Sequence, residues 1–132
     1  MQVIIFNLGE EQFAVKTEVV QNITDMMEVT RVPKAPKYIK GLINLRGNVI
    51  SLLDLNLLLD VKGKKEEHDS TIIIKIGDEA VGIAVDTVEE VLDIDESIIE
   101  NIEDNRDKKY IKGVLNFNDR IVTLIDVGRL IN

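Results

Sequence analysis

The same segment occurs twice in this chain, and the duplication limits its possible folds more than any other feature of the sequence. Residues 38–45 (YIKGLINL) recur as residues 110–117 (YIKGVLNF), at an offset of 72 positions (110 − 38). The match continues through residues 52–55 (LLDL) and 124–127 (LIDV). A unit of this length is too long for a solenoid repeat and suits one small β-subdomain per copy.

A weaker match upstream supports the same duplication. Residues 8–11 (LGEE) resemble residues 76–79 (IGDE) at an offset of 68 positions (76 − 8), so the second copy has gained four residues (72 − 68). A chain of 132 residues suits one domain, residues 1–132, built from two interlocked halves. We expect these halves at about residues 1–65 and 70–132, with a polar connector at about 62–70 and strands that can be exchanged between them.

Short apolar clusters rich in Val and Ile, separated by Gly, Asn and Asp, are typical of β-strands and turns. Gly9 and Gly77 each separate two such clusters, and a glycine can take the positive φ that a tight hairpin needs. Later hairpins are expected to turn at residues 46–48 and 118–120. About five short strands per copy are enough to form a small closed barrel, which leaves few exposed edges.

Two aspartates mark the starts of short helices. Asp54 and Asp126 each follow an apolar strand and precede a leucine-rich segment, so we expect their carboxylates to cap the first helical turn. The acidic stretch at residues 93–107 suggests a short amphipathic turn or helix, because its isoleucines have helical spacing (Ile98, Ile99 and Ile102).

Composition and charge argue against nucleic-acid binding, membrane insertion and disulfide bonds. A net charge of −8 argues against nucleic acid, because neutralising phosphates requires a clustered excess of Lys and Arg. No apolar run reaches the ~20 residues of a membrane span, and the N-terminus lacks the features of a signal peptide. A chain without cysteine has no disulfide or thiolate metal site and fits a reducing compartment. We expect a cytoplasmic protein that does not insert into the membrane.

No pattern in the sequence indicates catalysis. His68, the single histidine, stands in the charged connector with no Ser or Cys motif around it, so a hydrolytic nucleophile is not expected. The chain has no glycine-rich phosphate loop. The acidic run at residues 93–96 lacks the central glycine and the final glutamate of a calcium loop. We expect no catalytic residue, no metal and no cofactor, and a surface that binds other proteins.

One stretch of the chain is specific enough to indicate a family. Residues 41–55 (GLINLRGNVISLLDL) strongly resemble the signature segment of the CheW family, the chemotaxis coupling proteins. Residues 6–13 (FNLGEEQF), 29–33 (VTRVP) and 81–88 (VGIAVDTV) are also similar to that family. The resemblance extends over essentially the whole chain, and its motifs are specific as a set.

The resemblance implies an all-β fold: two five-stranded β-barrel subdomains, related by internal duplication, around a shared hydrophobic core, with short helices. It implies a non-catalytic chemotaxis adaptor that couples methyl-accepting chemoreceptors to the histidine kinase CheA. The expected partners are the cytoplasmic tip of the receptors and the regulatory domain of CheA, which is itself CheW-like. The expected location is the cytoplasm, at receptor arrays on the inner membrane.

Alignment with the family motif also implies a partner-binding groove. Its expected residues are Val20, Ile23, Arg46, Gly82, Val85, Val88 and Val91. For the apolar members, ordinary burial inside a barrel is the alternative explanation, because β-branched residues on alternating positions fill barrels in any case. Arg46 is more informative, because the turn that contains it does not need an arginine; its charge is expected to serve a partner or a salt bridge.

The sequence departs from the family pattern at three places. Many relatives carry a glutamate at the position of Asn22, available to pair with the arginine that matches Arg46, and that acid is absent here. Only the first hairpin turn retains the arginine-glycine pair, since the second reads NDR at residues 118–120. The chain stops at Asn132, where relatives often continue into a longer helix.

Two other functions fit parts of the sequence. The chain can be a CheW-like regulatory domain of a kinase or of a fused coupling protein, although Met1 directly before the first strand favours a free-standing product. A carboxylate-based hydrolase or a small-ligand-binding double barrel would need a concave pocket that holds paired acids with shifted pKa values.

Overall fold

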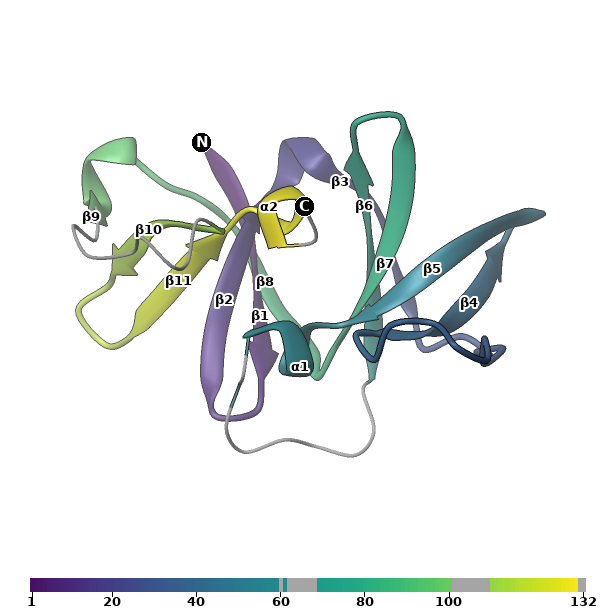
Figure 1. Cartoon of the computed structure of the whole chain (residues 1–132). Helices are drawn as coiled ribbons and strands as arrows, with labels where there is room; N and C mark the ends of the chain where they lie inside the picture. Colours follow the sequence, from purple (N-terminus) through teal and green to yellow (C-terminus); the bar gives the residue numbers. More distant parts are fainter. Residues whose placement is uncertain (60, 62–68, 101–109, 131–132) are drawn as a thin grey trace.

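Two β-sheets make up most of the protein (Figure 1). The computed structural model describes residues 1–59, 61, 69–100 and 110–130. The first sheet contains, in spatial order, β8 (Thr87–Asp93), β1 (Gln2–Leu8), β2 (Glu11–Lys16), β11 (Ile121–Ile125), β10 (Ile111–Asn116) and β9 (Ile99–Glu100). The second sheet contains β3 (Val20–Asp25), β6 (Ser70–Ile76), β7 (Glu79–Val85), β5 (Asn48–Asp54) and β4 (Ile39–Leu45).

The expected all-β class is confirmed, with one strand more than expected in the first sheet. The extra strand, β9, has only two residues and pairs with Val114 and Leu115 of β10. The connector is shorter than expected at its C-terminal end, because Ser70 already begins β6. His68 and most of the connector lie outside the described residues.

Each sheet combines strands from both sides of the connector. The β1–β2 hairpin lies in the first sheet, where β2 runs parallel to β11 and Ala14 faces Leu124. The β6–β7 hairpin lies in the second sheet, where β7 runs parallel to β5 and Gly82 faces Leu52. Figure 1 shows this exchange: the purple β1–β2 hairpin lies beside β10 and β11, and the green β6–β7 hairpin lies beside the blue β5.

Several strands are buried on both faces, and their consecutive residues enter different hydrophobic clusters. In β1, Phe6 enters a central cluster that the two sheets share, while Ile5 enters a cluster enclosed by the first sheet. In β6, Ile74 enters the central cluster and Ile73 enters a cluster enclosed by the second sheet. Since side chains alternate along a strand, this explains why these strands are continuously apolar. The expected shared core is therefore confirmed.

Residues with positive φ close the hairpins. Gly9 and Gly77 have φ angles of 59° and 60° at the tips of the β1–β2 and β6–β7 hairpins. In the β4–β5 hairpin, Arg46 and Gly47 form a two-residue loop with φ angles of 55° and 87°. Two successive positive φ angles match the twist of the flanking strands, as in type I′ turns.

Short helices follow β5 and β11, as expected. The Asp54 carboxylate accepts a hydrogen bond from the Leu57 amide (3.3 Å) at the start of α1 (Leu55–Leu59). The Asp126 carboxylate accepts from the Gly128 amide (3.1 Å) at the start of α2 (Val127–Leu130). No helix in the described part of the chain is long and apolar enough to span a membrane.

The expectation for the acidic stretch is only partly met. A 3₁₀ turn, η2 (Glu96–Ile98), forms at its start, but Ile99 already belongs to β9. Strand pairing with β10 replaces the helical continuation there. Ile102 lies outside the described residues. A second 3₁₀ turn, η1 (Thr17–Val19), leads from β2 into β3.

Leu52 and Leu124 occupy equivalent positions of the two repeats, 72 residues apart (124 − 52), with exposed fractions of 0% and 1%. We expect Leu52→Ala and Leu124→Ala each to lower the free energy of unfolding by about 2 to 5 kcal/mol, measured by urea denaturation, because each leaves a cavity. Val49→Ala is the control, since Val49 is 66% exposed. Equal effects of the three changes would contradict the burial described here.

Candidate functional site

The two outer strands β3 and β8 carry apolar residues on the surface. Each lies at one edge of its sheet. Val20 on β3 and Val88 on β8 are half-buried and pack against the same central cluster. Ile23 and Val91, further along these strands, are 40% and 51% exposed. The structure therefore brings Val20 and Val88 to the shared core and leaves Ile23 and Val91 open to solvent.

Two members of the expected groove are interior residues. Val85 is fully buried in the central cluster. Gly82 is also buried, and a Cβ atom there would lie 3.2 Å from Leu52 Cδ1 and 3.3 Å from Ile43 Cδ1. The small size of Gly82 thus accommodates side chains of its own sheet. Neither residue presents a surface to a partner in this structure.

Arg46 stands apart from these residues at the tip of the β4–β5 hairpin. It is exposed, and no ion pair or hydrogen bond of its guanidinium is found within the described residues. Its φ of 55° is in a region that Gly and Asn adopt at lower cost than arginine. Turn geometry therefore does not account for an arginine here, and neither does an internal salt bridge to a described residue.

Two strongly exposed apolar residues were missed by sequence reasoning. Val49 and Ile121 are 66% and 65% exposed, more than any other large apolar residue in the described part of the chain. Val49 follows the β4–β5 turn, and Ile121 follows the β10–β11 turn, at an offset of 72 positions (121 − 49). We call this pair the rim residues. The repeat itself was a usable signal, because both copies keep a β-branched residue at a position that a hairpin end exposes.

The second hairpin carries an arginine that has internal partners. Arg120 forms an ion pair with Glu90 of β8, and its guanidinium carbon lies 5.3 Å from the centre of the Phe117 ring. Glu90 immediately precedes Val91, and Arg120 immediately precedes the rim residue Ile121. The ion pair thus connects the tip of the β10–β11 hairpin to the outer strand β8, whereas Arg46 at the first hairpin makes no such connection to a described residue.

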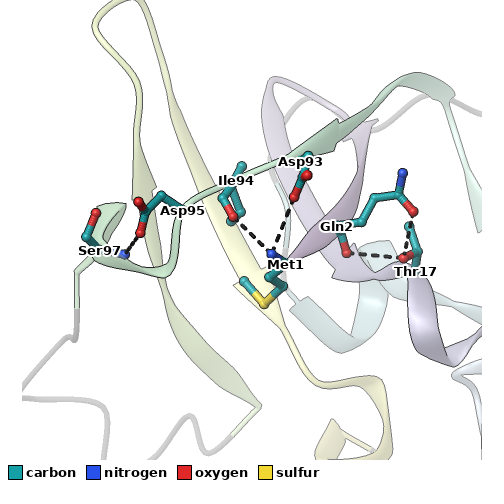
Figure 2. A network of polar contacts seen from close by, with 7 residues as sticks. All are labelled: Met1, Gln2, Thr17, Asp93, Ile94, Asp95 and Ser97. Atoms are coloured by element: carbon teal, nitrogen blue, oxygen red, sulfur yellow. Dashed lines mark hydrogen bonds and ion pairs between the residues drawn. The ribbon is translucent and has the colours of Figure 1, made fainter.

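Polar contacts also hold the C-terminal end of β8 (Figure 2). The Met1 amino group donates to the Asp93 carboxylate (3.4 Å) and to the Ile94 carbonyl (3.1 Å). The Asp95 carboxylate accepts from the Ser97 amide (2.9 Å) at the start of η2. Hydrogen bonds from the Ser97 amide and then its hydroxyl lower the pKa of Asp95. These contacts fix the path of the chain directly after Val91.

Buried carboxylates have structural partners. The Asp54 carboxylate caps α1, and the Asp86 carboxylate accepts from the Gly9 amide at 2.7 Å, linking the start of β8 to the β1–β2 turn. The part of the chain that the structure describes contains no group of three or more His, Asp or Glu side chains placed to hold a metal ion. What this arrangement offers at the surface is a set of exposed apolar residues and an exposed arginine, Arg46, at the tip of the β4–β5 hairpin.

The chain is similar to known proteins over almost its whole length. Residues 2–132 match the family model described as the CheW-like domain. The chemotaxis protein CheW of Helicobacter pylori is 32% identical, and the match covers 99% of this chain and 81% of the relative. The chemotaxis protein CheW of Bacillus subtilis is 31% identical, with 99% of this chain and 86% of the relative covered.

A solved structure has the same fold. The crystal structure of the scaffolding protein TtCheW from Thermoanaerobacter tengcongensis matches with a TM-score of 0.90 and 28% sequence identity. The match covers 98% of this chain and 90% of that one. The two sheets and the shared core described above are therefore the arrangement of a solved relative.

Arg120→Ala should lower the free energy of unfolding by about 1 kcal/mol, because it removes a partly exposed ion pair and a contact between cation and ring. Arg46→Ala, at the equivalent hairpin, should change it by less than about 0.5 kcal/mol. A double-mutant cycle with Glu90→Gln isolates the Glu90–Arg120 contribution in chemical denaturation. Additive effects of the two changes would show that the ion pair does not connect the hairpin to β8.

Proposed function

We propose, from the premise that this chain belongs to the CheW family, that it joins the cytoplasmic tip of methyl-accepting chemoreceptors to the regulatory domain of the histidine kinase CheA. The chain is a chemotaxis scaffolding protein of a non-catalytic family. In this role it acts in the cytoplasm, at receptor arrays on the inner membrane. Residues 1–132 act as one domain with interlocked halves, since each sheet takes strands from both sides of the connector.

The observation that carries the proposal is the equivalence of the two rim residues. Val49 and Ile121 are exposed to nearly the same extent and lie at the same place in the two repeats. An exposed apolar residue next to a hairpin tip is a natural anchor for a partner, because a few such anchors dominate the energy of an interface. Two equivalent anchors allow each sheet to pair with a matching sheet of the CheW-like regulatory domain of CheA.

The outer strands supply a separate surface for the receptor. Ile23 and Val91 are exposed, and Val20 and Val88 continue from them into the shared core. An apolar surface of this kind suits a helical hairpin whose apolar face lies against it. We assign the receptor tip to these four residues and leave out Gly82 and Val85, which are buried.

Arg46 adds charge to the first hairpin, three residues before Val49. An exposed arginine without an internal partner among the described residues is available to a carboxylate of a bound protein, and arginine can pair with a carboxylate through two parallel hydrogen bonds. Because Arg46 lies close to Val49 in the same hairpin, we assign it to the same contact. Coupling between receptor and kinase then requires both the rim residues and the outer strands.

Val49→Asp and Ile121→Asp should each weaken binding to the CheA regulatory domain by about 2 kcal/mol or more, measured by calorimetry, because each places a charge at an apolar anchor. Leu57→Asp is the matched control, since Leu57 is 49% exposed on α1 and away from both hairpin tips. Unchanged affinity in both rim variants would exclude this interface. If neither the kinase domain nor a receptor tip binds the unmodified chain at micromolar concentration, the whole proposal is wrong.

Arg46→Asn should weaken coupling between receptor and kinase while the melting temperature stays the same or rises slightly, because Asn adopts positive φ more readily than arginine. The binding assay and a thermal melt on the same preparation separate the two effects. Arg46→Glu should weaken binding further. A clear loss of thermal stability in Arg46→Asn would make Arg46 a structural residue instead.

A further inference from the structure

A small cavity lies at the seam between the two sheets and belongs to neither of the surfaces described above. It is lined by Val15 of β2, Ile74 of β6 and Ile125 of β11, together with Val127 and Gly128 of α2. Its volume is about 210 Å³. Figure 1 shows α2 in the region between β2 and β6, where these residues meet. The cavity floor is thus the central hydrophobic cluster itself.

Three lysines from three different strands contribute to the lining. Lys16 ends β2, Lys75 lies in β6 and Lys112 lies in β10, and all three line the cavity. The carboxylates of Glu18 and Asp126 line it as well, so the lining has an excess of one positive charge. This local excess contrasts with the net charge of −8 for the whole chain. This local excess of positive charge would attract an anion to the cavity.

The carboxylates of the lining are partly engaged elsewhere. The Asp126 carboxylate accepts from the Gly128 amide (3.1 Å) and lies 3.7 Å from Arg129 Nε. The Glu18 carboxylate lies 4.0 Å from Lys16 Nζ. Within the described residues, Lys75 and Lys112 form no ion pair with a carboxylate. The pKa of Lys112 is lowered, chiefly because its ammonium group is partly buried and secondly because the Lys16 ammonium group lies close by. An anion between the ammonium groups of Lys16 and Lys112 would relieve the repulsion between them.

We propose that this cavity binds a small organic carboxylate with an apolar body, seated with its chain or ring against Val15, Ile74 and Ile125 and with its carboxylate among the three lysines. An apolar cavity of about 150 Å³ is large enough for benzene, so this one can hold a ring or a short alkyl chain. It is too small for a folded peptide segment. The lining combines apolar side chains with charged groups, a combination that is found in small-ligand sites generally.

Such a ligand would contact both sheets at once. Lys16 and Lys112 belong to the first sheet and Lys75 belongs to the second, so one bound carboxylate would connect them across the seam. A ligand that binds the folded state alone raises the melting temperature in proportion to the logarithm of its concentration once binding is saturated. The proposal is independent of the receptor and kinase contacts, which involve other residues.

The test is a titration of the full chain with hexanoate, followed by amide NMR shifts and by the melting temperature. We expect saturable shifts at Gly77, Lys112 and Gly128 with a dissociation constant of about 1 mM, because a small ligand makes few contacts. Hexanol, which has no charge, and inorganic phosphate, which has no apolar body, should each bind at least about 10-fold more weakly. Hexylammonium should cause no saturable shifts.

Two variants separate the contributions of charge and cavity. Lys112→Met keeps the aliphatic stem and removes the charge, and should weaken hexanoate binding about 10-fold. Val19→Trp should fill the cavity, which Val19 also lines, and abolish binding with the lysines intact. Lys37→Met, a change at an exposed lysine away from the cavity, is the control.

Three results would overturn the proposal. The first is the absence of saturable shifts with hexanoate in the unmodified chain. The second is equal binding of phosphate and hexanoate, which would show attraction to surface lysines only. The third is undiminished binding in a folded Val19→Trp variant, which would place the ligand outside the cavity.

Discussion

Burial of strands on both faces is the constraint on which the rest of this structure depends. The buried apolar residues of β1 and β6 alternate between the central cluster and a cluster enclosed by one sheet, so none of these buried positions tolerates a charge. The central cluster takes residues from both sheets and from the starts of α1 and α2. The β1–β2 and β6–β7 hairpins can each join a sheet whose other strands come from the opposite side of the connector. They can do so because the strands of both hairpins contribute apolar side chains to the shared core.

The same constraint determines which residues remain for partners. The middle parts of the interior strands have both faces occupied, so exposed apolar residues concentrate on the outer strands and at hairpin ends. Ile23 and Val91 lie on outer strands, and Val49 and Ile121 lie directly after hairpin turns. The Glu90–Arg120 ion pair joins one outer strand to one hairpin. In the proposed role such a scaffold needs no reactive group, because exposed anchors held at fixed positions are sufficient.

Much of the fold could be predicted from the sequence because the duplication and the turn glycines are local signals. The hairpins at Gly9 and Gly77 and the caps at Asp54 and Asp126 were all predicted correctly. Site residues were harder, because a valine in a strand looks the same whether it faces a partner or the core. Val85 and Val91 share that ambiguity: Val85 lies on the interior strand β7 and is buried, whereas Val91 lies on an exposed position of the outer strand β8. The lysines around the seam cavity come from distant parts of the sequence, so no local pattern could connect them.

The most direct test of the central claim is reconstitution of a CheA kinase with receptor fragments, with and without this chain, while autophosphorylation is measured. If the chain joins the two partners through its outer strands and rim residues, kinase output depends on the receptor only when the chain is present. Kinase output that responds to the receptor equally well without the chain, or not at all with it, would contradict the account.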